Sequence, residues 1–219
     1  MTNERKGVSK MPSREEVLQF MQKEALPYRF RLVKAPQPLR VNIEQKVIYV
    51  GEDVLMSVIK NLVEDGLDWR EIMRKNLMHE KTHEKYQKWL YKWGVSAEAY
   101  GWLPSFLIDV VIDKIHFKDN KRYQKWLLAD ARHAYKITKR DLPTLIPPGG
   151  KKPSFLYVQA AYWVSIGAIT LDEAIELYPE KADFIIELAQ IFNRINREED
   201  LEWAFNEARE IYLRKIGPY

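Results

Sequence analysis

The stretch His79-Glu80-Lys81-Thr82-His83 lies within a segment from Asp68 to Trp93 that has the pattern of one long helix. Two histidines four residues apart project from one face of a helix, where both imidazoles can reach a single zinc ion. Glu80 follows the first histidine directly and would lie beside the metal. Ile72 and Leu90 fall on the same stripe, which turns the histidines toward the protein interior. The segment therefore predicts a helix that binds a metal ion.

The composition narrows the chemistry that this chain can use. Of its 219 residues, 46% are apolar and 12% aromatic, which excludes disorder as the main state. It contains no cysteine, so disulfides, thiolate nucleophiles and cysteine-ligated metals are excluded. A metal site must therefore use carboxylates and the four histidines, which are His79, His83, His116 and His133.

Two carboxylates follow in a very apolar segment. Asp109 and Asp113 are four residues apart in the helix predicted from Pro104 to Phe117. Burying an unpaired carboxylate is costly, so buried acids are normally hydrogen-bonded, paired with cations or bound to metals. Zinc ligation by one aspartate and orientation of a ligand by the other would provide this compensation. The alternative is that both aspartates pair with arginine or lysine where two helices meet.

The order of these elements resembles that of gluzincin-type zinc metallopeptidases, above all their smallest single-domain members, the minigluzincins. A strand or two, a helix, the HExxH helix and a helix with an acid and then Asp four residues later form the shared plan, over about residues 28–117. The resemblance implies that His79, His83 and Asp109 bind zinc. It also makes Glu80 the general base and Asp113 the acid that orients a ligating histidine.

Three residues depart from the pattern of that family. Lys81 and Glu84 are charged where uncharged residues are usual, so we expect Lys81 to point out of the core. Asp109 stands where the family usually has glutamate, and its shorter side chain requires the two helices to approach more closely. Asp113 and His116 therefore remain alternatives for the third ligand.

The implied reaction is hydrolysis of peptide bonds in a peptide or protein substrate. Three protein ligands would leave one position on Zn²⁺ for a water molecule, whose proton Glu80 would accept and pass to the leaving amine. The developing oxyanion normally needs a second donor besides the metal. The candidates are His116, His133 and Tyr123, and His116 is favoured because it shares a helix face with the two aspartates.

A segment from Lys46 to Val50 resembles the edge strand on which gluzincins hold a peptide as an added strand. Ile48 and Tyr49 would then be substrate-binding residues. Main-chain pairing of this kind tolerates many peptide sequences.

The predicted fold is α+β and mainly helical. Runs rich in Val, Ile, Tyr and Phe at 28–35 and 39–50 predict a small antiparallel sheet. We expect a zincin-like core over residues 1–140, a Pro/Gly linker or lid at 141–153 and a helical region at 154–219. Capping signals and apolar periodicity predict helices near residues 13–26, 52–64, 68–93, 104–117, 120–139, 155–166, 171–177, 180–196 and 198–216.

A membrane span is the alternative for residues 153–171, which carry no charge over nearly the length needed to cross a bilayer. Gln159, Ser165 and Gly167 interrupt this run, and Thr170 with Glu173 forms a new capping box, so we expect a buried helix instead. The N-terminus has basic residues but no apolar stretch behind them. We therefore expect a cytoplasmic protein without a membrane span.

Two other functions compete with peptide hydrolysis. Basic and aromatic residues alternate at 84–93 and 120–127, which could indicate nucleic-acid binding. However, 35 basic residues against 31 acidic ones leave an excess of only four charges, and both segments fit amphipathic helices equally well. Zinc could also serve only to join two helices. Glu80 argues against this second alternative, because a structural site has no use for an acid beside the metal. The sequence gives no basis for an oligomeric state.

Overall fold

The computed structural model describes residues 11–35, 38–93, 102–145 and 152–217. The chain is mainly helical with one small sheet, which confirms the mainly helical α+β class. It divides into two compact units, Met1–Glu84 and Lys85–Tyr219. The boundary between the units falls within one continuous helix, α3.

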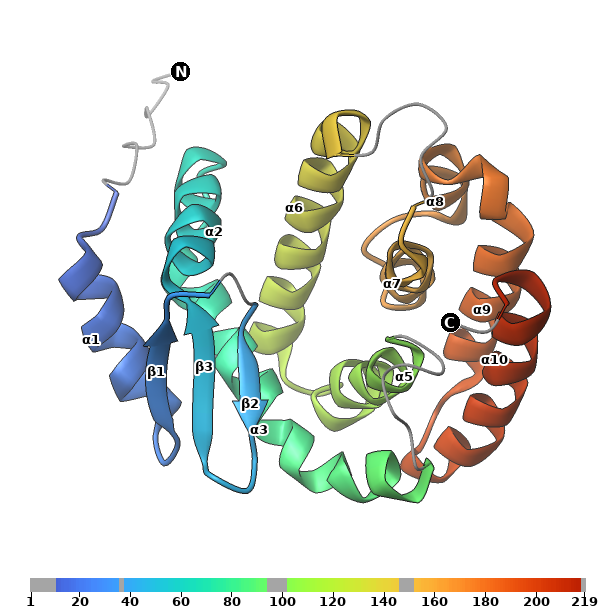
Figure 1. The fold of residues 1–219 in the computed structure, drawn as a ribbon, viewed down its shortest axis with the longest axis horizontal. Coiled ribbons are helices and arrows are strands. Elements are labelled where there is room, and N and C mark those ends of the chain that lie inside the picture. Colours follow the sequence, from blue (N-terminus) through green and yellow to red (C-terminus); the bar gives the residue numbers. More distant parts are fainter. Residues whose placement is uncertain (1–10, 36–37, 94–101, 146–151, 218–219) are drawn as a thin grey trace. The chain divides into compact units, whose positions relative to one another are not determined.

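The first unit contains α1, the sheet, α2 and most of α3 (Figure 1). The Ser13 side chain accepts a hydrogen bond of 3.2 Å from the Glu16 amide and starts α1, as predicted. Asp68 accepts a bond of 3.0 Å from the Arg70 amide and starts α3 in the same way. The elements are α1 (Arg14–Ala25), β1 (Arg29–Val33), β2 (Arg40–Asn42), β3 (Val47–Gly51), α2 (Glu52–Glu64) and α3 (Trp69–Trp93).

The sheet is mixed and not antiparallel throughout, so this part of the prediction is wrong. Its strand order is β1-β3-β2, with β3 between its neighbours (Figure 1). The turn at 43–46 joins β2 and β3 into the predicted antiparallel hairpin, but β1 pairs with β3 in parallel. The apolar pattern identifies each strand. It does not show which strand β1 pairs with, or in which direction, because that depends on how the distant segments of the chain pack.

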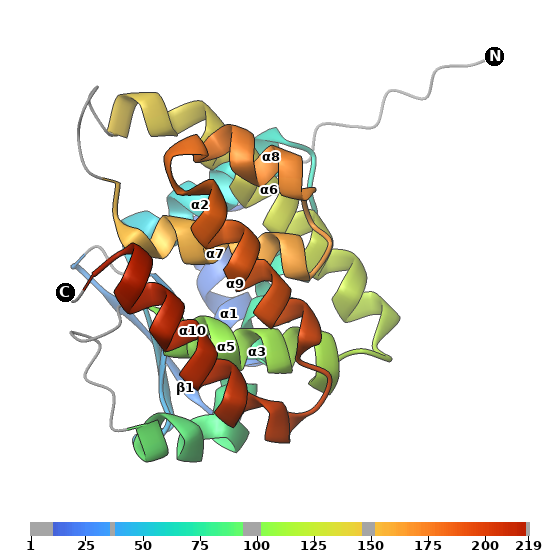
Figure 2. The ribbon, with the colours of Figure 1, turned by 90° about the vertical axis from the view of Figure 1, so that its right-hand side faces the viewer.

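The second unit is wholly helical over its described residues. Figure 2 shows α9 and α10 side by side, and both α7 and α10 pack against α5 and α9. Beyond the end of α3, its elements are α5 (Leu103–Val111), a π-helical turn η1 (Ile112–His116), α6 (Lys121–Leu145), α7 (Ser154–Ser165), α8 (Leu171–Leu177), α9 (Ala182–Arg194) and α10 (Leu201–Lys215).

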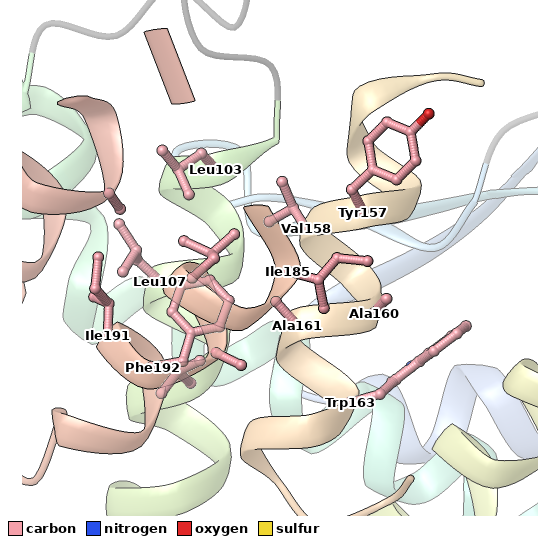
Figure 3. Close-up of a cluster of buried hydrophobic side chains, with 14 of the residues drawn as sticks. Leu103, Leu107, Tyr157, Val158, Ala160, Ala161, Trp163, Ile185, Ile191 and Phe192 are labelled. Atoms are coloured by element: carbon pink, nitrogen blue, oxygen red, sulfur yellow. The ribbon is translucent and has the colours of Figure 1, made fainter. Parts of the chain in front are cut away.

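One buried apolar cluster holds this second unit together (Figure 3). Leu107 of α5, Val158 and Ala161 of α7 and Phe192 of α9 are all fully inaccessible to solvent. The helix that bears the two aspartates therefore shares its core with the C-terminal helices. The α5 helix thus covers part of the apolar faces of α7 and α10.

The predicted linker is partly helical. Residues 141–145 belong to α6, although the sequence predicts that this helix ends near Lys139. Residues 146–151 lie outside the described residues. Leu142 is buried with the apolar cluster, and this packing extends the helix beyond its predicted end.

Most of the charge-free run at 153–171 forms α7, which ends at Ser165 and is followed by Gly167 at a φ of 74°. This matches the helix predicted to end there, because glycine adopts a positive φ without strain. Among the described residues, none of the helices combines the length and the apolar character that crossing a membrane requires.

Leu107→Ala should lower the free energy of unfolding by about 2–5 kcal/mol, because it leaves a cavity in the core of the second unit. Leu213→Ala is the matched control, since this leucine of α10 is 41% exposed and should change stability by about 0.5 kcal/mol or less. Urea denaturation measures both values. Equal losses in the two variants would contradict this assignment of the core.

Candidate metal centre

The two histidines of the HExxH sequence lie one turn apart on α3. Their ring centroids are 4.9 Å apart at an interplanar angle of 72°. Fully buried Ile72 and Leu77 anchor the preceding turns of the helix, while His79, Glu80 and His83 are half-buried. The histidines therefore neither point into solvent nor lie in the apolar core, and a bound ion could reach them.

Lys81, between the histidines, binds the end of another helix. Its ammonium group donates to the carbonyl oxygens of Glu24 at 2.9 Å and Leu26 at 3.2 Å, at the C-terminus of α1. The last carbonyls of a helix lack partners within that helix, so a lysine there satisfies them. Burial lowers the pKa of Lys81. Lys81, whose charge is unusual in the gluzincin pattern, therefore does not extend into solvent. It joins α3 to α1 through these two hydrogen bonds.

Glu84, directly after the second histidine, fastens α3 to the sheet. Its carboxylate accepts hydrogen bonds from the Lys46 ammonium group and, at 2.5 Å, from the Tyr28 hydroxyl. These two bonds, that from Lys46 being the larger influence, lower the pKa of Glu84. Because the ion pair is about half exposed, it contributes little energy but restricts the rotation of the helix.

Lys81→Met should lower the free energy of unfolding by about 1–2 kcal/mol, because two α1 carbonyls lose their donor. The control is Lys60→Met, which removes only an exposed pair with Glu64 at 3.8 Å and should cost less than about 0.5 kcal/mol. Chemical denaturation of metal-free protein gives both values. The role of Lys81 would be disproved by an effect no larger than that of Lys60.

The second unit contains the two aspartates on consecutive turns. Asp109 of α5 is half-buried, whereas Asp113 in η1 is fully buried. The Tyr123 hydroxyl donates to one oxygen of Asp113, and the Tyr162 hydroxyl donates to the other. Burial first and the charge of Asp113 second raise the pKa of both tyrosines, so both hydroxyls stay protonated as donors. Asp113 is thus held by tyrosines, a compensation that the sequence did not predict.

The π-helical turn is a second feature that the sequence did not reveal. The spacing predicts Asp109, Asp113 and His116 on one face of an α-helix, but η1 contains more residues per turn than an α-helix. The wider turn changes the direction in which His116 points. No periodic signal identifies a single π turn, since its apolar residues are the same as those of an α-helix.

His116 lies beside the end of α3 that belongs to the second unit. Its Nδ1 is 3.4 Å from the Tyr86 hydroxyl and its Nε2 is 3.4 Å from the Lys85 ammonium group. Burial and then Lys85 lower its pKa, so the imidazole is neutral at pH 7. Of the other two donor candidates, Tyr123 is bound to Asp113, and His133 on α6 is only 6% exposed.

Lys85→Met should raise the pKa of His116, because it removes a positive charge beside the ring, although burial keeps that pKa below the ordinary value. Protonation of His116 then occurs at higher pH than in the wild type. Histidine NMR titration measures the change, with Lys88→Met as the control, since Lys88 pairs with Glu198 at 2.6 Å. An unchanged or lower pKa in Lys85→Met would contradict the contact.

Three of the predicted ligands form a group that could hold a metal ion. One ligand atom each from His79, His83 and Asp109 lies within 4.8 Å of the other two. Ligands of one tetrahedral zinc at about 2.0–2.1 Å are about 3.3 Å apart, which is below the 4.8 Å within which these three atoms lie. Two nitrogens and one oxygen also match the donors that catalytic zinc prefers. Asp113 and His116, the alternative third ligands, are not part of this group.

The predicted substrate strand is not an edge strand. β3 pairs with β1 over its whole length and with β2 from Val47 to Tyr49, which occupies both of its sides there. Ile48 is fully buried, and the Tyr49 hydroxyl donates to Gln45 at 3.1 Å. A peptide therefore cannot add as a strand beside Ile48 and Tyr49, because their main-chain groups already pair within the sheet.

The basic and aromatic residues near the end of α3 contact other parts of the second unit. Lys92 pairs with Glu202 at 2.9 Å, and the Trp89 indole donates to Glu198 at 3.0 Å. The Trp93 ring stacks on Phe205 of α10 with centroids 4.5 Å apart. These contacts match the amphipathic-helix interpretation of this segment.

Comparisons of the chain with known proteins do not identify a family for it. No protein-family model matches the sequence, and neither the curated proteins nor the solved structures gave a match. Functional inference therefore depends on the residues of the site.

Proposed function

We propose that this protein is a zinc-dependent metallopeptidase that hydrolyses peptide bonds within a zincin-like core. The proposal depends on one observation, the group of His79, His83 and Asp109 with Glu80 beside the first histidine on α3. A purely structural zinc site does not require an acid next to its ligands. Glu80 therefore favours a catalytic over a structural metal.

The donor set assigns the ligands. His79, His83 and Asp109 would hold Zn²⁺, and three protein ligands are typical of catalytic zinc. When bound, zinc would supply a Lewis acid that lowers the pKa of a water molecule and polarises the substrate carbonyl. Glu80 would accept the proton of that water on its carboxylate and deliver it to the leaving amine.

His116 is the additional donor that we favour in this proposal. Its ring is half-buried, neutral at pH 7 and in contact with Tyr86, three residues beyond His83 on α3. A neutral imidazole can donate one N–H to an oxyanion that develops on the substrate. The resemblance to gluzincins assigns Asp113 to orient a ligating histidine. Because its two carboxylate oxygens already accept tyrosine hydroxyls, Asp113 would instead act on the site through Asp109, one turn before it.

Elemental analysis should find about one zinc per chain in the wild type and none in His79→Ala after identical handling. Glu80→Gln should keep its zinc but lose at least about 100-fold in the rate of peptide hydrolysis, because the amide cannot accept the proton. Cleavage of a mixed peptide library, followed by mass spectrometry, measures the activity. The matched control is Glu64→Gln on α2, whose exposed carboxylate should affect neither zinc content nor hydrolysis.

Two outcomes would overturn the proposal in different ways. A wild type that takes up no zinc, even after zinc is added back, has no metal site at these residues. A wild type that binds zinc, loses thermal stability on chelation and cleaves no peptide contains a structural site.

A further inference from the structure

A buried polar cluster connects three helical elements of the second unit. Asp113 of η1 is 0% exposed, and its two carboxylate oxygens accept from Tyr123 of α6 and Tyr162 of α7. Its neighbours on the chain, Val111 and Ile112, are also fully buried. The two hydroxyls thus provide directed donors to a charge inside an apolar core.

Such an arrangement holds the carboxylate in one orientation. Hydrogen bonds to an ionised acceptor are shorter and about twice as strong as neutral ones. With one tyrosine on each oxygen, rotation of the carboxylate would break both bonds at once. The donors come from separate helices, so the orientation of Asp113 depends on how α6 and α7 pack.

Asp109 belongs to the same electrostatic environment. After burial and the charge of Asp113, the charge of Asp109 also raises the pKa of both Tyr123 and Tyr162. Asp109 lies four residues before Asp113, and the segment between them is helical without interruption. Fixing Asp113 therefore also fixes the turn from which Asp109 extends.

We propose that Tyr123 and Tyr162 are positioning residues of the metal centre, which hold Asp113 and thereby set the placement of Asp109 as a ligand. This inference rests on the proposed function, because it requires that Asp109 binds zinc. It also gives the C-terminal helical region a role, since Tyr162 belongs to α7. That region would then help to position a ligand of the centre.

Tyr157 provides a matched control on the same helix. Tyr157 is buried on α7, where Tyr162 is partly buried, and its hydroxyl is 3.3 Å from a carboxylate oxygen of Glu180, a different acid. Removing this hydroxyl removes a tyrosine–carboxylate contact from the same helix without touching Asp113. A purely structural effect of a lost tyrosine hydroxyl should therefore appear in both variants.

The experiment measures the zinc dissociation constant of the full chain by competition with a chelator. Tyr162→Phe should weaken zinc binding about 10-fold, which is typical for residues that support a ligand without binding the metal. Tyr157→Phe should change zinc binding less than about 2-fold. Tyr123→Phe should match Tyr162→Phe, and it serves as the second variant if Tyr162→Phe does not fold. Cobalt substituted for zinc should show shifted visible absorption bands in Tyr162→Phe but not in Tyr157→Phe.

A double mutant tests whether Tyr162 acts on zinc binding through Asp113. In an Asp113→Asn background, Tyr162→Phe should weaken zinc binding no further, because the residue through which it acts has changed. Zinc binding in Tyr162→Phe and Tyr123→Phe that is as tight as in the wild type would overturn this inference alone. A wild type that binds no zinc would overturn the proposed function together with the inference.

Discussion

The arrangement of the candidate site depends on the period of α3. Successive residues of an α-helix point about 100° apart, so side chains four apart share a face and those between them point elsewhere. His79 and His83 thus occupy one face, while Lys81 reaches the end of α1 and Glu84 reaches Lys46 and Tyr28 at the sheet. The same short stretch therefore presents ligands and fixes its own rotation. The charges of Lys81 and Glu84, which are unusual in the gluzincin pattern, are compatible with the candidate site because these side chains point away from the face that bears the histidines.

The second unit combines apolar packing with a few directed polar contacts. Its core is built from α5, α7, α9 and α10, and apolar burial has no preferred direction. Asp113 adds direction, because each of its oxygens accepts one tyrosine hydroxyl. Lys114 does so as well, since its ammonium group donates to the Phe192 carbonyl at 2.9 Å. Such contacts specify how η1 lies on its neighbours, which apolar packing alone leaves less well defined.

Local chemistry explains why most of the helices could be predicted. Ser13 and Thr170 cap helices where the sequence indicates, and Gly66 and Gly167 follow helix ends with positive φ values. Predictions that needed distant partners were less accurate. The sheet is mixed because β1 lies beside β3, and α6 extends past its predicted end because Leu142 joins the core. Neither partner is visible in the local sequence.

The sequence by itself determined the donor types, the spacing of His79, Glu80 and His83 on one helix, and the presence of two acids in an apolar segment. These features are local, because a helix period fixes which side chains share a face. Tertiary structure alone decided that Asp113 is bound by Tyr123 and Tyr162. It also placed β3 between two strands. The physical reason is that pairing and burial depend on residues far apart in the chain, which only packing brings together.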